Sequence, residues 1–166
     1  MNGSGADHWQ TTWERLLPRA RRVLARDWDR PVCADWVAAL ERAVAAAGPE
    51  VVLVAHSLGC LQVIHWASQT ALASRAALLV APPDPNRPAF PAAALGFAPL
   101  PLVPLPFTST VVASEDDPYA TLAFSRRCAE AWGSRFVDAG RRGHLNAQSG
   151  LGEWDEGLRI LDGLIG

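Results

Sequence analysis

The sequence predicts an α/β fold, a three-layer sandwich in which a mostly parallel sheet lies between helices. Short apolar runs rich in β-branched residues alternate with longer segments of helical periodicity, an order typical of parallel sheets. The runs expected as strands are 51–54, 76–81, 108–113 and 135–138. A chain of 166 residues, 49% of them hydrophobic, suffices for one core, so we assign residues 1–166 to a single domain.

The helical segments are placed by apolar residues that recur every three or four positions. The first covers 8–24 in spite of Pro18, with a short strand over 22–25 as an alternative for its end. The second covers 34–47 and is stopped by Gly48 and Pro49. The remaining expected helices are 61–68, 119–132 and 153–165.

The segment from Pro82 to Pro106 differs in composition, because it contains nine of the 13 prolines. Proline removes backbone donors, so this segment cannot form a long helix or a central strand. We expect a long loop that passes over the functional site and is too short to be a folded cap domain.

Charge and cysteine content exclude several classes of protein. The net charge of −2 gives no reason for binding to nucleic acid or to an anionic membrane, and no apolar run is long enough to span a bilayer. The three cysteines are an odd number without metal-ligand spacing, which favours free thiols in a reducing compartment. We therefore expect a cytoplasmic protein without a bound metal; its oligomeric state is left open.

A candidate nucleophile follows the run 51–54 directly, in Ala55-His56-Ser57-Leu58-Gly59. A buried strand, a sharp turn with serine at its apex and then a helix is the layout of a nucleophile elbow. The usual pattern is Gly-x-Ser-x-Gly, and Ala55 keeps most of the clearance of the first glycine. The structural alternative is a strand–helix turn that happens to contain serine.

Ser57, the Asp116/Asp117 pair and His144 each follow a different expected strand. A serine hydroxyl needs an imidazole to take its proton, and the imidazole needs a carboxylate to fix its tautomer. The order Ser, Asp, His is that of α/β-hydrolases. We choose Asp117 as the acid, with Asp116 or Glu115 as a supporting or surface charge.

Each member also has a structural interpretation. Asp117 before Pro118 is typical of a helix start, with the aspartate as N-cap, and a loop histidine such as His144 is usually just solvated. We expect the side chain of His56 to point away from the base position and to serve packing or support, and His65 to be structural. His8, Trp9 and His56 are candidates for lining the site, with packing near the N-terminus as an equal alternative for His8.

An oxyanion hole needs two backbone N–H groups. The elbow assigns one of them to Leu58, the residue after the nucleophile. The other normally comes from a loop after an earlier strand, and here Asn2 or Gly3 is the candidate.

With these motifs the chain resembles the small serine hydrolases of the YdeN and retinoblastoma-binding-protein-nine type, compact α/β-hydrolases without a cap domain. The resemblance covers nearly the whole chain, through Gly3-Ser4-Gly5, His8-Trp9, Trp13, Ala55 to Gly59, Ser114 to Pro118 and Gly143-His144. It implies a triad of Ser57, Asp117 and His144 that hydrolyses carboxylic esters or related acyl compounds.

Members of that family begin with an apolar strand before the glycine-rich loop, whereas this sequence starts inside the loop. Without that strand, the run 51–54 would have an unpaired edge. We interpret the departure as a truncated chain or a misassigned start, and expect weak activity from the 166-residue form.

The leading functional hypothesis is therefore a serine hydrolase for small esters or amides, with a shallow apolar pocket and no cofactor. Acyl transfer and thioester cleavage by the same triad are not distinguished from it. The alternative from another class is a catalytically weak hydrolase fold that binds proteins through its proline-rich loop.

Overall fold

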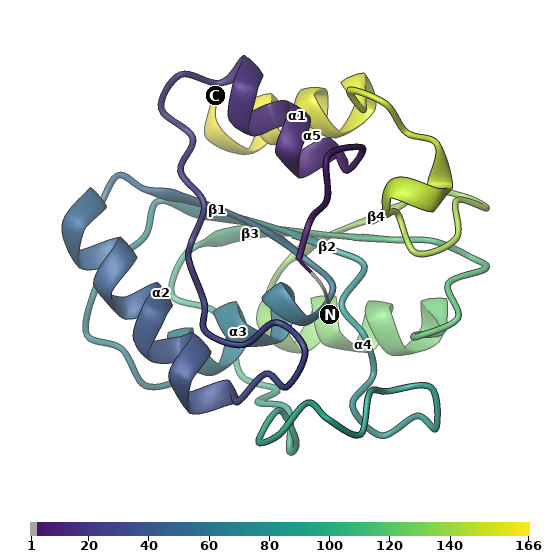
Figure 1. The fold of residues 1–166 in the computed structure, drawn as a ribbon, viewed down its shortest axis with the longest axis horizontal. Helices are drawn as coiled ribbons and strands as arrows, with labels where there is room; N and C mark the ends of the chain where they lie inside the picture. The colour runs from purple at the N-terminus through teal and green to yellow at the C-terminus, as the bar shows by residue number, and fades with distance from the viewer. Residues whose placement is uncertain (1–2) are drawn as a thin grey trace.

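The computed structural model describes residues 3–166, which form a sheet of four parallel strands in the order β1-β2-β3-β4 (Figure 1). The strands are β1 (Val52–His56), β2 (Ala76–Val80), β3 (Thr108–Ala113) and β4 (Arg135–Asp138). Each pairs in parallel with the next along the chain. The predicted α/β class is confirmed. After each strand the chain crosses back, so that the next strand begins at the same end of the sheet and runs parallel to it.

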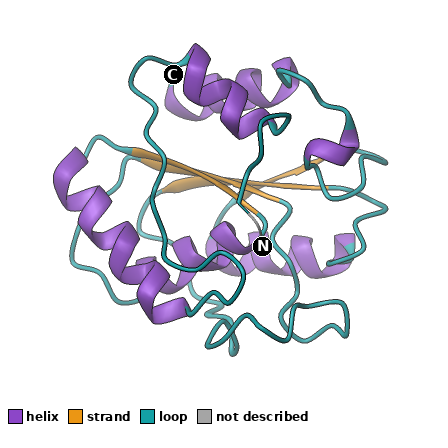
Figure 2. Cartoon of the chain, viewed as in Figure 1, coloured by secondary structure: helices purple, strands orange, loops and turns teal. Residues whose placement is uncertain are grey.

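Helices cover both faces of this sheet, which gives three layers (Figures 1 and 2). The helices on one face are α2 (Cys33–Ala47), α3 (Leu58–Ala67) and α4 (Leu122–Trp132). Those on the other are α1 (Trp9–Leu16) and α5 (Asp155–Ile165). A 3₁₀ turn, Ala147–Ser149, precedes α5.

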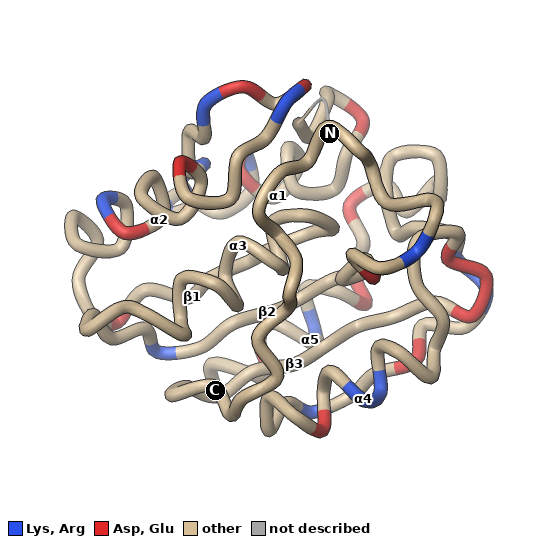
Figure 3. The backbone as a smooth tube through the Cα atoms, turned by 90° about the horizontal axis from the view of Figure 1, so that it is seen from below, with Lys and Arg blue, Asp and Glu red and all other residues tan. Residues whose placement is uncertain are grey.

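Strand β2 lies at the centre of the two cores that these layers enclose, and all five of its residues are buried. Because successive side chains of a strand point to opposite faces, Ala77 and Leu79 join the core under α2 and α3, while Leu78 and Val80 join the core under α1 and α5. Acidic and basic residues are interspersed along helices and loops (Figure 3). Within residues 3–166 no helix has the length and apolarity needed to cross a membrane.

Several predicted boundaries are wrong. Helix α1 ends at Leu16, and the segment 18–25 is neither the predicted end of a helix nor the alternative strand. Pro18 ends the helix because its ring lacks an N–H and excludes the preceding residue from helical geometry. Helix α3 begins at Leu58, directly after the turn, and α4 begins at Leu122 rather than at Tyr119.

The proline-rich segment adjoins the site near its start, where the Asp84 N–H donates to the carbonyl of Tyr119, but most of it does not pass over the site as predicted. Strands β2 and β3 are parallel neighbours, so the connection from the carboxyl end of β2 to the amino end of β3 must run back along the length of the strands. It forms no helix or strand over 82–107 and packs against the α2–α3–α4 face, where Phe97 is fully buried. There the Trp132 indole donates to the Pro101 carbonyl, and the His65 ring bonds the Phe97 carbonyl, which confirms the structural role expected for His65.

Strand β1 is an edge strand within the described part of the chain, as expected for the run 51–54. Its residues alternate between buried and half-buried, in contrast to β2. The Gln10 side-chain amide, from α1, donates to the Val54 carbonyl at 3.2 Å, so one polar group of the edge is bonded by a side chain instead of a strand.

Helix α5 contains a matched pair of glycines for testing its packing. A methyl group at buried Gly157 would overlap the indole of Trp154, which packs against Trp9 and Trp13, whereas one at exposed Gly163 meets nothing within 4 Å. We expect Gly157→Ala to destabilise the protein by about 1–3 kcal/mol. Gly163→Ala should stabilise it by up to about 1 kcal/mol, because alanine has the higher helix propensity. Urea unfolding measures both, and equal effects would contradict this packing.

Candidate active site

Ser57 occupies a sharp turn between β1 and α3. Its φ of 54° and ψ of −126° lie outside the regions that side-chain-bearing residues usually adopt, as is typical of a strained elbow. A Cβ built on Gly59 would lie 3.8 Å from the Ala55 Cβ, an ordinary van der Waals distance. Alanine therefore fits at the position where the usual pattern has glycine.

The structure brings the three predicted residues Ser57, Asp117 and His144 together. The His144 Nε2 atom lies 2.8 Å from the Ser57 Oγ, and its Nδ1 atom lies 2.9 and 3.0 Å from the two carboxylate oxygens of Asp117. Asp117 and His144 are each only 8% exposed. The carboxylate thus fixes the tautomer that leaves Nε2 free to accept a proton from the serine.

The interpretation of Asp117 as a helix N-cap is wrong. The N-cap of α4 is Thr121, whose side chain accepts from the Phe124 N–H. Asp117 instead accepts from the Tyr119 N–H at 2.8 Å, which forms a local turn and orients the carboxylate toward His144. The Tyr119 ring packs against the His144 ring, with centroids 4.5 Å apart, a contact that sequence reasoning missed.

Asp116 connects the loop of the acid with the loop of the base. Its carboxylate accepts from the Ser114 hydroxyl at 2.9 Å and from the Gly143 N–H at 2.8 Å, and it faces Arg141 at 3.9 Å. These hydrogen bonds, first among them the one from Gly143, hold the pKa of Asp116 below its ordinary value. The Arg142 N–H also donates to the Ser114 hydroxyl. Asp116 therefore holds Gly143, the residue before His144, whose φ of 56° makes the turn into the histidine.

The sequence offered Trp9 as a candidate for lining the site. Its side chain is instead buried, with only 1% exposed. Its indole Nε1–H donates to the Leu145 carbonyl at 2.8 Å and so anchors the residue after His144. Leu145 has φ of 49°, a strained conformation that this bond helps to maintain. The pairing of a helical tryptophan with a loop 136 residues away had no signal in the sequence.

His8 is the N-cap of α1, where its Nδ1 atom accepts from the Gln10 N–H. Its ring is 5% exposed and packs edge-on against His56, with centroids 4.8 Å apart. Burial, followed by the charges of Arg22 and His144, lowers the pKa of His8 to about 4. Packing near the N-terminus, the alternative we held open, thus describes His8 better than site lining does.

The predicted orientation of the His56 side chain is wrong, whereas the packing expected of it is found against His8 and His144. The His56 side chain does not point away from the base: the Nε2 atom lies 2.8 Å from the His144 carbonyl oxygen, and the two rings have centroids 4.9 Å apart. Burial and the neighbouring His144 hold the pKa of His56 well below its ordinary value.

Of the predicted oxyanion donors, Leu58 is the first residue of α3, so its N–H has no acceptor within the helix. Gly3 has φ of 64°, and a Cβ there would contact the Trp28 ring at 3.7 Å. Asn2 lies outside the described residues. The second donor stays a prediction.

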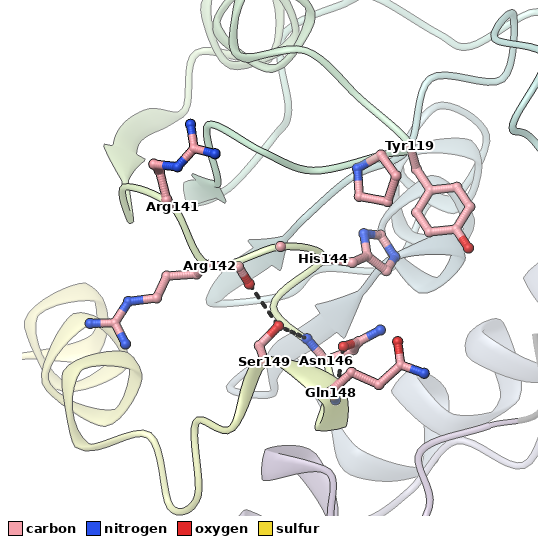
Figure 4. Close-up of a pocket in the computed structure, with 9 residues that line it drawn as sticks. Tyr119, Arg141, Arg142, His144, Asn146, Gln148 and Ser149 are labelled. Atoms are coloured by element: carbon pink, nitrogen blue, oxygen red, sulfur yellow. Dashed lines mark hydrogen bonds between the residues drawn. The ribbon is translucent and has the colours of Figure 1, made fainter.

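A cavity of about 480 Å³ adjoins His144 (Figure 4). His144 and Tyr119 lie on one side of it, and the side chains of Arg141 and Arg142 extend away from them; Asn146, Gln148 and Ser149 complete its polar lining. The expectation that exposed tryptophans shape the pocket is wrong, because no tryptophan lines this cavity. Trp28 is half-buried and the other six tryptophans are buried in the cores.

Residues 3–166 contain no cluster of three or more His, Cys, Asp or Glu side chains placed to hold a metal ion. All three cysteines are free and buried. Burial raises the pKa of each thiol, to about 11 for Cys33 and about 12 for Cys128, so these thiols are not activated.

The parallel α/β fold, the strained serine turn and the adjoining histidine define the class of α/β-hydrolase-like proteins. The model of a family described as serine hydrolase matches residues 1–163, and the chain belongs to this family. The resemblance stated from the sequence motifs is thereby confirmed.

Solved structures agree with this assignment. A protein described as a YdeN-like hydrolase from Pectobacterium atrosepticum is 32% identical with a TM-score of 0.88, and the match covers 99% of this chain and 86% of that one. The ydeN gene product of Bacillus subtilis is 20% identical with a TM-score of 0.81, over 95% and 90% of the two chains. A thermophilic esterase from Thermogutta terrifontis shares the fold with a TM-score of 0.62 at 20% identity, over 94% and 84%. No curated protein matches the sequence.

The lowered pKa of His8 predicts a pH-dependent stability. An ordinary histidine titrates near 6.5, so between this value and about 4 the unfolded chain binds a proton that the folded protein does not. Stability from neutral His8 is fully present above the upper value and is lost as the pH falls toward the lower one. His8→Asn keeps a side-chain acceptor at the N-cap and should lose less stability between about pH 7 and about pH 5 than the wild type. Urea unfolding at the two pH values measures this, and an unchanged difference would contradict it.

The role of Asp116 can be tested without assuming any activity. Asp116→Ala removes the acceptor of the Gly143 N–H, so we expect hydrogen exchange of the segment 140–146 to become faster. Glu115→Ala, at an exposed neighbour, is the control and should leave that exchange rate unchanged. Equal exchange in the two variants would show that Asp116 does not hold the loop.

Proposed function

We propose that the protein is a serine hydrolase that uses Ser57 as nucleophile, His144 as base and Asp117 as the acid that orients His144. The observation that carries this proposal is the unbroken chain of hydrogen bonds from the Asp117 carboxylate through both ring nitrogens of His144 to the Ser57 Oγ. Membership of the serine hydrolase family supports it independently.

In this mechanism the Ser57 Oγ attacks the carbonyl carbon of the substrate while its proton passes to the His144 Nε2. The Asp117 carboxylate stabilises the imidazolium that forms, and the Leu58 N–H, at the start of α3, donates to the developing oxyanion. His144 then protonates the leaving group. Water, deprotonated by the same imidazole, attacks the acyl-enzyme and releases the acid, so no cofactor enters the cycle.

For the substrate class we propose small carboxylic esters or related acyl compounds. The leaving group must lie beside His144, since that ring protonates it, and the cavity of about 480 Å³ there is large enough for a small molecule. Its polar lining favours a polar leaving group over a long alkyl chain. The structural neighbour from Thermogutta terrifontis, described as an esterase, is consistent with this class.

A fluorophosphonate probe, which reacts with activated serines, tests the assignment. We expect the wild type to be labelled, and Ser57→Ala and His144→Ala to lose labelling. Asp117→Asn should slow it by about 10³–10⁴-fold, because the amide favours the wrong imidazole tautomer. Ser68→Ala removes an exposed hydroxyl at the end of α3 and should be labelled like the wild type.

The same variants should be compared on short p-nitrophenyl esters. Turnover that disappears with the Ser57 and His144 substitutions would support ester hydrolysis. A folded wild-type protein that is not labelled and turns over no ester would contradict the proposed function.

A further inference from the structure

The backbone of His144 is held by the residue that precedes the nucleophile. His56 is the last residue of β1 and pairs with Val80 of β2, so the sheet fixes its backbone. Its imidazole Nε2 lies 2.8 Å from the carbonyl oxygen of His144, and their rings are packed with centroids 4.9 Å apart. A single side chain therefore connects the strand that carries Ser57 to the loop that carries its base.

This contact has a definite hydrogen-bond direction. A carbonyl oxygen only accepts, so the Nε2 atom of His56 must carry the proton and donate it. The ring is expected to be neutral near pH 7, since burial and the neighbouring His144 both lower its pKa. Neutrality matters here, because His144 becomes positively charged during catalysis and a second charge beside it would oppose that step.

His144 needs such a support because its loop has no regular secondary structure between Asp138 and Ala147. Asp117 and Ser57 bond the ring of His144 but leave its backbone unconstrained. Trp9 fixes the next residue through the Leu145 carbonyl, from the α1 side of the loop. His56 fixes His144 itself, from the strand side.

We propose that His56 is a positioning residue for the reaction: its Nε2–H···O=C bond to His144 sets the distance between the His144 Nε2 and the Ser57 Oγ. This inference rests on the proposed function of Ser57 and His144. His56 takes no part in proton transfer, because its donor nitrogen is occupied by the carbonyl. Its effect is on how often the base is within reach of the nucleophile.

Two substitutions separate the hydrogen bond from the packing. His56→Gln keeps an amide donor of similar reach, and His56→Leu keeps a similar volume without a donor. His65, on helix α3, provides matched controls. Its Nε2 also bonds a loop carbonyl, that of Phe97. The controls are His65→Gln and His65→Leu.

The measurement is the rate constant of fluorophosphonate labelling together with its end point. Molecules that have misfolded irreversibly lower the end point, whereas a misplaced base lowers the rate constant at full end point. Reversible unfolding also lowers the rate constant, so urea unfolding must show that each variant is fully folded under the labelling conditions. We expect His56→Leu to be slower by about 10- to 100-fold at full end point. His56→Gln should stay within about threefold of the wild type, since the bond is kept. Both His65 variants should keep the wild-type rate constant.

A second readout does not depend on catalysis. Hydrogen exchange of the segment 142–146 should accelerate in His56→Leu and stay unchanged in His56→Gln. If the wild type is not labelled at all, the proposed function fails, and this exchange still decides whether His56 holds the loop.

The inference is overturned if His56→Leu keeps the wild-type rate constant and exchange. It is also overturned if His56→Gln is as slow as His56→Leu, since packing would then be the cause. An equal loss of rate in His65→Leu would show a general effect of stability and would equally exclude a specific role for His56.

Discussion

The hydrogen bonds on the two ring nitrogens of His144 are the constraint on which the site depends. They require an oxygen of Asp117 and the Oγ of Ser57 to lie on opposite sides of one imidazole. These residues follow β3 and β1, and the histidine follows β4. Because the strands are parallel, their carboxyl ends lie at the same end of the sheet, and loops from distant parts of the sequence meet there.

The sheet alone does not hold the imidazole in place, since the loop of His144 has no regular structure. Three side chains from different elements fix it: Asp116 through the Gly143 N–H, His56 through the His144 carbonyl and Trp9 through the Leu145 carbonyl. The bonds from Trp9 and His56 satisfy carbonyl groups that are shielded from water, and the bond to Asp116 lies at the surface. The position of His144 thus depends on hydrogen bonds to the backbone of its loop, made by residues that do not themselves react.

Most elements were predictable from local pattern, and the errors have identifiable causes. The strands 108–113 and 135–138 were predicted with the observed bounds, because short runs with β-branched or aromatic residues lie there between turn residues. Asp117 before Pro118 favoured a cap, yet Thr121 caps α4, because the helix begins only at Leu122 and the Asp117 carboxylate accepts from Tyr119 N–H in the preceding turn. The tryptophans do not shape a pocket as expected, because six of the seven are buried in the cores, where large aromatic side chains contribute most.

The sequence by itself determined the α/β class, the elbow at Ser57 and the order of serine, aspartate and histidine, since these follow from periodicity and from short motifs. Only the tertiary structure decided that Trp9 and His56 contact the loop of His144, that Asp116 joins two loops and that most of the proline-rich segment packs on the α2–α3–α4 face of the sheet. The physical reason is that these contacts join residues far apart in the chain. Their partners are backbone groups, which every residue carries and which leave no pattern in the sequence.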